Sequence, residues 1–428
     1  MEPGGPRHDW RPRLRPIDVQ PARADGQLVY CLRDRLDPDG PTLVVSPEAL
    51  LLISLFDGTR DLRGVQIAFA LRTGQTLPLE QIAAVAEQLD EAYFLAGPRR
   101  DAREAAQRAA FAALPHRPAV HAGGAYPGEP ATLEAALDGY FVADGGPGLP
   151  VPPTDRRELA ALIAPHVDLH RGGPTYAWAY RALAEAVSPE LIVLLGTCHA
   201  PMSVAFAATT KDYDTPFGPL PTDAAFVREL ATRYIGNGGI DGVPALLVDE
   251  YAHRAEHALE FQAVYLRYLQ RKGWLGPVQV VPILCAAPHG LVAAGGSPCE
   301  VPAIAELLDL LSAQLAADGR RWCLIAGADL AHIGPQFGDS QPVSRTWLTH
   351  VEAADRAMLG LTAAGDAEGF YHQVMDDGDS RRICGVAPIY ALLRLLPPSR
   401  GEVLRYTQWA DTAGDGAVTF ASVAFWRA

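Results

Sequence analysis

Three histidines each follow an apolar run that ends in small residues. The runs and their histidines are 159–163 with His166, 191–195 with His199, and 323–326 with His332. Each run is typical of a buried strand, and the carboxyl ends of neighbouring strands in an α/β sheet open onto one crevice. Taken singly, a histidine after a strand is usually an ordinary turn or packing residue. Three of them together favour a shared site, where imidazoles suit iron, copper or zinc.

The turn that follows the first run carries more polar side chains than a connection needs. Asp168, His170 and Arg171 come directly after His166, at the start of a helical pattern. These three side chains could bind a carboxylate or phosphate group of a substrate, or they could form a salt-bridged turn. The residues alone leave both interpretations open.

Composition limits the kind of protein that this chain can be. A length of 428 residues favours two domains over one, with three as a further option, and 49% hydrophobic residues supply a sizeable core. The formal charge of −14 argues against nucleic acid or an anionic membrane as a partner of the whole chain. No secretory signal, long apolar span or Cys-x-x-Cys pair is visible, which predicts a cytoplasmic protein with free thiols.

The first part of the chain predicts a small module of strands followed by helices. Residues 1–12 are rich in proline and arginine and are expected to be disordered. In the segment 13–97, short β-like runs precede Ser46-Pro47, which is a strong helix start, and two further helical patterns follow. We interpret this segment as a winged-helix-like α+β domain. Residues 98–114 are Ala-rich and charged, which predicts a linker helix.

This module resembles the PqqD-like domains of peptide-modifying enzyme systems. The resemblance rests on Ser46-Pro47-Glu48-Ala49, on Leu55-Phe56-Asp57-Gly58-Thr59-Arg60 and on the closing helix at 89–95. It implies that an extended peptide or a partner protein binds at the sheet edge by strand addition. A winged helix used for packing or dimerisation is the alternative. DNA binding is disfavoured because the third helix carries acidic residues and no lysine or arginine.

The second domain, 115–428, alternates apolar runs with helical patterns, which is typical of an α/β sheet protein. Besides the three runs above, strands are expected at 204–208, 245–248, 278–284 and 418–425, and helices at 134–141, 224–234, 255–269, 304–317, 347–364 and 388–396. Such an alternation would bring the polar turns to one edge of the sheet.

Seven ordered motifs in this domain resemble the Memo family, which includes the bacterial proteins called AmmeMemoRadiSam system protein B. They are His121-Ala122-Gly123-Gly124-Ala125-Tyr126, Ala164-Pro165-His166 with Gly172-Gly173, Gly196-Thr197-Cys198-His199, Asp214-Thr215-Pro216-Phe217-Gly218, Glu256-His257-Ala258-Leu259-Glu260, Asp329-Leu330-Ala331-His332 and Cys384-Gly385-Val386-Ala387-Pro388-Ile389. The fold of this family is similar to that of class III extradiol dioxygenases, which use non-haem iron. The resemblance therefore implies a sheet-and-helix metal-binding domain.

Carried over motif by motif, the resemblance implies metal ligands at His166, His199 and Cys384. A thiolate among the ligands favours Fe(II), then copper, with zinc least favoured. Two arginines precede this cysteine, and we expect them to lower the pKa of its thiol. On the residues alone, Cys384 is an ordinary buried thiol before a helix.

The same resemblance implies an acid/base pair at Asp329 and His332, with the carboxylate orienting the imidazole. His257 is expected to line the crevice as a hydrogen-bond donor or a substrate contact. His121 is a further candidate substrate contact.

The sequence departs from the common pattern of the family in two turns. After Ala-Pro-His, many relatives continue with Ala-Gly-Tyr, where this chain has Val167-Asp168-Leu169-His170-Arg171. The second turn has one histidine where many relatives have two. These departures leave the metal expectation in place and make Asp168, His170 and Arg171 candidates for setting the substrate.

One rival motif points to a different chemistry. His253-Arg254-Ala255-Glu256-His257 fits H-x-x-E-H, in which two histidines on one helix face bind zinc and the glutamate acts as a base in a peptidase. A five-residue pattern arises easily by chance, and only its Glu-His part belongs to the Memo pattern.

The hypothesis that these observations favour is an O2-dependent oxidoreductase with one non-haem iron, acting on a peptide or small molecule that the first domain recruits. His332 would act as the acid/base group. The competing class is a non-enzymatic iron or copper carrier, or an adaptor that keeps the fold without the chemistry.

Overall fold

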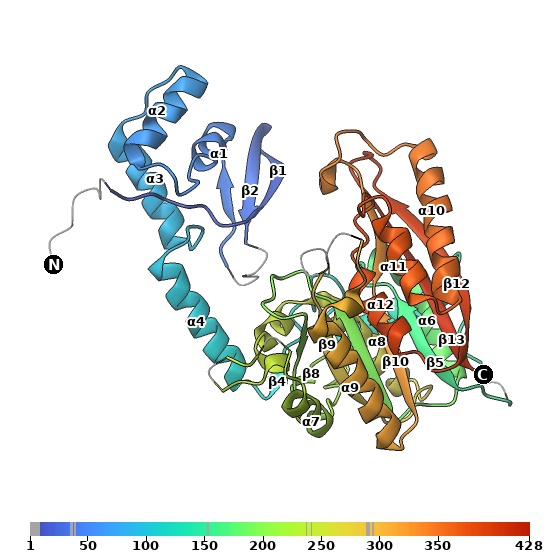
Figure 1. The fold of residues 1–428 in the computed structure, drawn as a ribbon. Coiled ribbons are helices and arrows are strands. Elements are labelled where there is room, and N and C mark those ends of the chain that lie inside the picture. The colour runs from blue at the N-terminus through green and yellow to red at the C-terminus, as the bar shows by residue number, and fades with distance from the viewer. Residues whose placement is uncertain are drawn as a thin grey trace. The chain divides into compact units, whose positions relative to one another are not determined.

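A computed structural model of the protein describes residues 9–34, 37, 40–151, 154–236, 238–240, 242–287, 292 and 295–428. The chain divides into two compact units, Met1–Ala113 and Leu114–Ala428, which we call the N-terminal unit and the C-terminal unit (Figure 1). Among the described helices, none combines the length and the apolar character that crossing a bilayer requires.

The N-terminal unit is a three-stranded antiparallel sheet followed by helices. Its elements are β1 (Asp18–Ala24), β2 (Gln27–Arg33), β3 (Leu43–Val45), α1 (Pro47–Ile53), α2 (Leu62–Thr73) and α3 (Leu79–Glu91), and the strands lie in the order β1-β2-β3. The expected helix start is present, since the Ser46 hydroxyl accepts the N–H of Ala49 at 3.2 Å. Gly74, at φ 72°, ends α2.

The predicted linker helix, α4 (Pro98–Ala113), is anchored to the N-terminal unit by hydrogen bonds. Arg103 donates from Nε to Asp37 at 2.7 Å, and Gln107 donates to the same carboxylate at 2.8 Å. Asp37 is buried, so this contact stabilises the docked helix. Of the segment predicted to be disordered, residues 1–8 lie outside the described residues, while Trp10 packs against the core of the unit.

The C-terminal unit is built on one mixed sheet, which confirms the α/β fold class. Its strands are β5 (Leu159–Ala164), β6 (Leu191–Thr197), β7 (Phe206–Ala208), β9 (Gln279–Cys285), β10 (Trp322–Gly327), β11 (Asp329–Ile333), β12 (Ser399–Ala410) and β13 (Ala417–Arg427). The order is β11-β13-β5-β10-β6-β9-β7, with β12 paired to β13. The four central strands, β5, β10, β6 and β9, run parallel. A separate parallel pair joins β4 (His116–Arg117) to β8 (Asp212–Tyr213).

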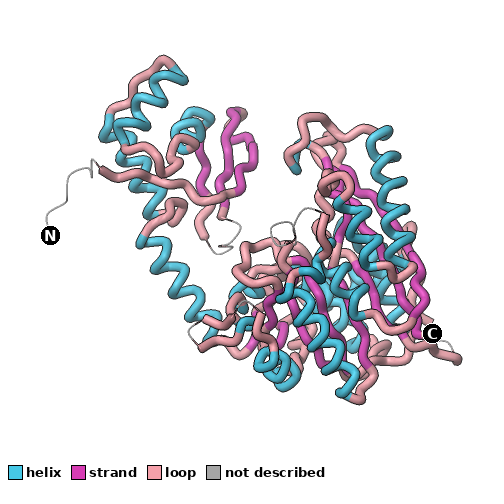
Figure 2. Tube along the Cα trace, in the orientation of Figure 1, coloured by secondary structure: helices cyan, strands magenta, loops and turns pink. Residues whose placement is uncertain are grey.

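Helices cover both faces of this sheet (Figures 1 and 2). Along β6, Leu191, Val193 and Leu195 belong to one hydrophobic cluster, while Ile192 and Leu194 belong to another. This alternation is what a strand buried on both faces requires. The first cluster includes residues of α7 (Ala224–Arg233), α9 (Pro302–Asp318), α10 (Arg345–Ala363), α11 (Ala367–Met375) and α12 (Val386–Leu395), and the second includes α5 (Pro130–Val142), α6 (Leu169–Glu185) and α8 (His257–Arg271).

One strand expectation is wrong. The apolar run 245–248 forms a short 3-10 helix, η1 (Ala245–Leu247), which begins after Pro244. Ala245 and Leu246 are nevertheless buried in the first hydrophobic cluster. A short apolar run reports burial, and its periodicity alone cannot distinguish a strand from a helical turn.

The sheet order brings the three strand ends of interest together. In the parallel register, Gly327 at the end of β10 lies opposite Ala164 of β5 on one side and Gly196 of β6 on the other. The amino ends of α6, α8 and α12 directly follow residues of this edge, because these helices begin after Asp168, Glu256 and Gly385. The carboxyl edge of the central strands is therefore the place where the candidate site residues meet.

Candidate metal centre

His166 is buried after β5 and has a defined orientation. Its Nδ1 lies 3.0 Å from the carbonyl oxygen of Gly327, and its Nε2 lies 3.2 Å from Sγ of Cys384. Because a carbonyl can only accept, Nδ1 must carry the proton and Nε2 keeps its lone pair. The backbone N–H of His166 donates to Asp329 at 2.9 Å. The ring thus presents an unprotonated nitrogen to the cysteine.

Cys384 is placed by the loop that enters α12. Its carbonyl oxygen accepts the hydroxyl of Thr197, the last residue of β6, at 2.9 Å. The next residue must be small, since a Cβ added to Gly385 would lie 2.5 Å from the carbonyl oxygen of Asp329. The loop therefore holds the sulfur against the strand ends.

The expectation that two arginines activate this thiol is wrong. Arg381 forms an ion pair with the buried Asp355, and Arg382 pairs with Asp339 at 2.7 Å. Both positive charges are thereby neutralised by carboxylates. Burial raises the pKa of the Cys384 thiol well above its usual range, and Asp329 adds to the effect.

His199, after β6, is held by the carboxylate of Glu256. Its backbone N–H donates to this carboxylate at 2.8 Å, and its Nδ1 lies 3.1 Å from Oε1. The ring centroids of His166 and His199 are 5.1 Å apart. Ligand atoms of His166, His199 and Cys384 all lie within 4.8 Å of one another, so a single ion could contact the three.

The protonation states fit a metal site, because metal ions bind neutral imidazole. Burial, with a contribution from His199, lowers the pKa of His166 to about 3. Burial acts to raise the pKa of Glu256, yet its contacts with His199 and His257 leave that pKa well below the ordinary value. A soft sulfur with two imidazoles is a donor set that suits Fe(II), copper or zinc.

Asp329 and His332, on β11, both lie at this edge but make separate contacts. The carboxylate of Asp329 accepts the N–H of His166, and its Oδ2 lies 3.7 Å from Nε2 of His166. Nδ1 of His332 lies 3.1 Å and 3.2 Å from the carbonyl oxygens of Leu330 and Arg382. Backbone carbonyls thus orient His332, and the expected orienting role of Asp329 applies to the His166 turn instead.

Burial changes the proton affinity of both groups. It raises the pKa of Asp329 to about 6, although His332 and the backbone N–H groups of His166 and Val167 oppose this. It lowers the pKa of His332, with Asp329 opposing. Near neutral pH, Asp329 is therefore close to its titration range while the imidazole is neutral.

His257, the first residue of α8, lies beside His166 and His199. Its ring is stacked on that of His199, with centroids 4.8 Å apart and planes 17° apart, and lies 5.3 Å from that of His166. His121 lies farther out, 5.8 Å from His257. Its Nε2 is 3.0 Å from the carbonyl oxygen of Ala255, so backbone contacts engage this ring.

Asp168, His170 and Arg171 lie at the start of α6. Arg171 is 3.7 Å from the Asp168 carboxylate, and its guanidinium stacks 4.3 Å over the ring of Trp409 on β12. His170 is exposed. These contacts are those of a salt-bridged turn, and a substrate role for the three residues stays a prediction.

The H-x-x-E-H interpretation is wrong for this fold. His253 is fully buried in η2 (Glu250–Arg254), outside α8, so the motif does not lie on one helix. Its Nδ1 lies 2.7 Å from the hydroxyl of Tyr213, and its Nε2 lies 2.9 Å from the carbonyl oxygen of Ala207. Both ring nitrogens are therefore engaged in the core, and His253 cannot join His257 as a zinc ligand.

Sequence reasoning missed the role of Glu256 as the residue that holds His199. It placed this glutamate in a family motif and considered it as a peptidase base, but it predicted no contact with His199. The position of Glu256 in the sequence could have indicated a structural role, because an acidic residue directly before a helical pattern is a candidate N-cap. Glu256 does cap α8, accepting the N–H of Ala258 at 3.0 Å.

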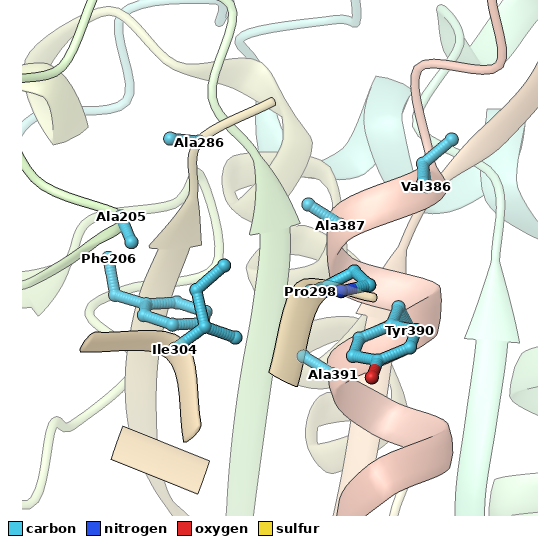
Figure 3. A pocket seen from close by; sticks show the side chains of 9 residues that line it. All are labelled: Ala205, Phe206, Ala286, Pro298, Ile304, Val386, Ala387, Tyr390 and Ala391. Atoms are coloured by element: carbon cyan, nitrogen blue, oxygen red, sulfur yellow. The ribbon is translucent and has the colours of Figure 1, made fainter. Parts of the chain in front are cut away.

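An apolar pocket lies against the first turns of α12 (Figure 3). It is lined by Ala205, Phe206, Ala286, Pro298, Ile304, Val386, Ala387, Tyr390 and Ala391. The cavity has a volume of about 20 Å³, which is room for one water-sized molecule. None of the candidate metal ligands lines it, so the pocket is separate from the candidate metal centre.

Comparison with known proteins identifies similar sequences. A family described as "Memo-like protein" matches residues 117–424. A "MEMO1 family protein" of Aquifex aeolicus is 26% identical over 419 residues, which cover 97% of this chain and 100% of that protein. One from Methanopyrus kandleri is 29% identical and covers 72% of this chain and 98% of its own length. A third, from Thermus thermophilus, is 28% identical and covers 81% of this chain and 93% of its own.

Proposed function

The chain belongs to the Memo family, and from that premise we propose that its C-terminal unit binds one metal ion, Fe(II) in preference to copper or zinc, and uses it as an O2-dependent oxidoreductase. The observation that carries the proposal is the meeting of His166, His199 and Cys384, whose ligand atoms lie within 4.8 Å of one another. These residues come from three distant segments, so their convergence is a property of the fold.

The donor set supports iron or copper over harder ions, because a thiolate and two imidazoles form a soft site. Three protein ligands also leave positions for an exogenous ligand, as catalytic sites require. When bound, Fe(II) would supply the affinity for O2 and the capacity for electron transfer. A bound cation would also lower the pKa of Cys384 and so offset the cost of burying its thiolate.

The chain's own residues would bind and orient the substrate and carry its protons. His332, held at Nδ1 by two carbonyl oxygens, would exchange a proton at Nε2 as the acid/base group. Asp329 fixes the backbone of the His166 turn and would keep that ligand in place. His257 would contact the substrate from the α8 side of the crevice.

For the N-terminal unit we propose the recruitment of an extended peptide. In the order β1-β2-β3, the short strand β3 is an edge, and Val44 in it is 59% exposed. An exposed edge offers backbone groups for strand addition. The bound peptide would itself be the substrate of the C-terminal unit, or it would carry a small-molecule substrate.

The test of the metal site is the metal content of full-length protein purified without air and loaded with Fe(II). Wild type is expected to hold one ion per chain, and His166→Ala, His199→Ala and Cys384→Ser are each expected to lose it. His372→Ala, at an exposed position of α11, is the matched control. Full metal retention in all three site variants would overturn the assignment.

Oxygen uptake separates the enzyme from the carrier. The Fe(II)-loaded protein is expected to consume O2 in the presence of a substrate peptide or small molecule, and Cys384→Ser is not. Stoichiometric iron without O2 consumption across a broad substrate screen would favour the carrier or adaptor. Peptide recruitment is tested separately by titrating the full chain with peptides encoded by neighbouring genes. If none of these peptides binds, the proposal that the N-terminal unit recruits a peptide is wrong.

A further inference from the structure

Glu256 makes an unusual number of contacts for one buried carboxylate. It accepts the backbone N–H groups of His199 at 2.8 Å and Ala258 at 3.0 Å. It also contacts two imidazoles, since Nδ1 of His199 lies 3.1 Å and Nδ1 of His257 lies 3.3 Å from its Oε1. An ionised carboxylate has room for about four donors, so it can accept both backbone N–H groups and both imidazole Nδ1–H groups.

The two imidazoles that meet Glu256 are nearly parallel. Their planes differ by 17° and their centroids are 4.8 Å apart. Both rings turn Nδ1 toward the same carboxylate, and Nε2 is on the far side of each ring. Nε2 of each ring therefore points away from Glu256.

We propose that Glu256 is the positioning residue of the crevice: its one carboxylate fixes the Nδ1–H tautomer of both His199 and His257, so that two Nε2 lone pairs face the crevice together. The link to metal binding rests on the proposed function, which makes His199 a ligand. His257 then stands beside that ligand with a hydrogen-bond acceptor. The substrate group that fits it is a donor, a hydroxyl or an amine.

Metal-binding histidines in general depend on a hydrogen-bond partner such as this carboxylate. A ligating histidine keeps its tautomer and ring direction through a hydrogen bond from its other nitrogen, and losing the partner typically costs 10–100-fold in metal affinity. Here one carboxylate would serve a ligand and its neighbour at once. A glutamine in its place has one acceptor oxygen, and its amide group can only donate. It could therefore not accept the backbone N–H groups of His199 and Ala258 and both imidazoles at once.

The first test reads tautomers in the metal-free full-length chain. Two-bond ¹H–¹⁵N spectra of histidine-labelled protein are expected to show the Nδ1–H form for His199 and His257, assigned with single His→Phe variants. In Glu256→Gln at least one ring is expected to leave that form. Unchanged tautomers of both rings in Glu256→Gln would overturn the proposal.

The second test measures Fe(II) affinity by anaerobic competition. Glu256→Gln is expected to bind 10–100-fold more weakly than wild type, whereas His257→Phe, which leaves Glu256 on His199, is expected to bind as wild type does. If Glu256→Gln and His257→Phe both lose stoichiometric Fe(II) binding, then Glu256 and His257 are themselves ligands of a different metal site. That result would overturn the proposal.

The matched control is Glu129→Gln. Glu129 is also a glutamate N-cap, accepting the N–H of Thr132 at 2.8 Å at the start of α5. Glu129→Gln is expected to change neither the histidine tautomers nor the Fe(II) affinity, which separates helix capping from positioning.

If Glu256→Gln fails to fold, Glu256→Asp replaces it, and its shorter side chain is expected to release one ring. If the wild type shows the expected tautomers but binds no Fe(II), the positioning role of Glu256 is supported and only the proposed function is refuted.

Discussion

Sγ of Cys384 lies 3.2 Å from Nε2 of His166, although the two residues are 218 positions apart in the chain. The other ring nitrogen of His166 donates to Gly327, so Nε2 accepts and the thiol is the donor. The pair is thus a neutral S–H···N contact in the metal-free protein. A metal ion that bound both atoms would replace this proton, which couples metal affinity to pH.

The metal-free Cys384 thiol should react slowly with alkylating agents. Burial raises its pKa well above the usual range, and the thiolate is the reactive form. At about pH 7.5, peptide mapping by mass spectrometry should show modification of the half-buried Cys31 and Cys299 before Cys384. Preferential modification of Cys384 would mean that an unpaired arginine activates it after all.

Replacing Asp329 with asparagine should raise stability in a pH-dependent way. Burial raises the folded pKa of Asp329 from 3.8 to about 6, so the folded chain binds more protons than the unfolded chain between these values. Stability of wild type therefore falls as pH rises through this window, by up to about 3 kcal/mol. Asp329→Asn keeps the acceptor for His166 and cannot ionise.

Urea unfolding of the metal-free proteins at a series of pH values checks this. The free energy of unfolding of Asp329→Asn minus that of wild type should grow from about pH 4 to about pH 6 and then level off. A difference that stays constant across the series would show that Asp329 titrates as it does in the unfolded chain.

His253→Ala should damage stability and spare metal binding. The variant leaves the hydroxyl of Tyr213 and the carbonyl of Ala207 without their partner and opens a cavity in the core. We expect a loss of about 3 kcal/mol in the free energy of unfolding. Iron content, measured together with denaturant unfolding, should equal that of wild type. If the variant folds but holds no metal, His253 is a metal ligand and the H-x-x-E-H interpretation is correct.

Gly385→Ala should disturb the position of Cys384. Its Cβ would lie 2.5 Å from a backbone oxygen of Asp329 and 2.8 Å from Cβ of Ala328, and neither atom can move without shifting the backbone where β10 passes into β11. We expect a loss of roughly 1–3 kcal/mol in stability together with weaker Fe(II) binding. Both are measured by thermal unfolding and anaerobic titration.

The matched control for that substitution lies in α10. Gly360 is exposed there, and an added Cβ would have no heavy atom within 4 Å apart from its chain neighbours and the nearby backbone of its own helix. Gly360→Ala should stabilise the protein by about 0.5–1 kcal/mol and leave metal binding unchanged. Equal effects of the two alanines would show that crowding at Cys384 is unimportant.

Much of the local structure follows from residues close together in the chain. Ser46-Pro47 starts α1, Asp223 caps α7, and a buried run precedes His166. Each of these features depends on side chains and backbone groups within a few positions, so composition and spacing suffice to predict it. The sequence by itself therefore determined which turns carry the candidate ligands.

The meeting of those turns was decided by the tertiary structure. In the chain β6 follows β5, but in the sheet β10 lies between them, and His166 and His199 at the ends of the two outer strands come to 5.1 Å between ring centroids. Strand order depends on packing between distant segments, which no local pattern encodes.

Tertiary contacts also decided what the neighbouring side chains do. Arg381 and Arg382 adjoin Cys384 in sequence, yet Asp355 and Asp339 hold their charges, and Glu256 orients His199 from 57 positions away. Sequence alone located the chemical groups, whereas their partners, and hence their protonation and direction, follow from long-range packing. The physical reason is that hydrogen bonds and Coulomb interactions depend on distance in space, and folding sets that distance.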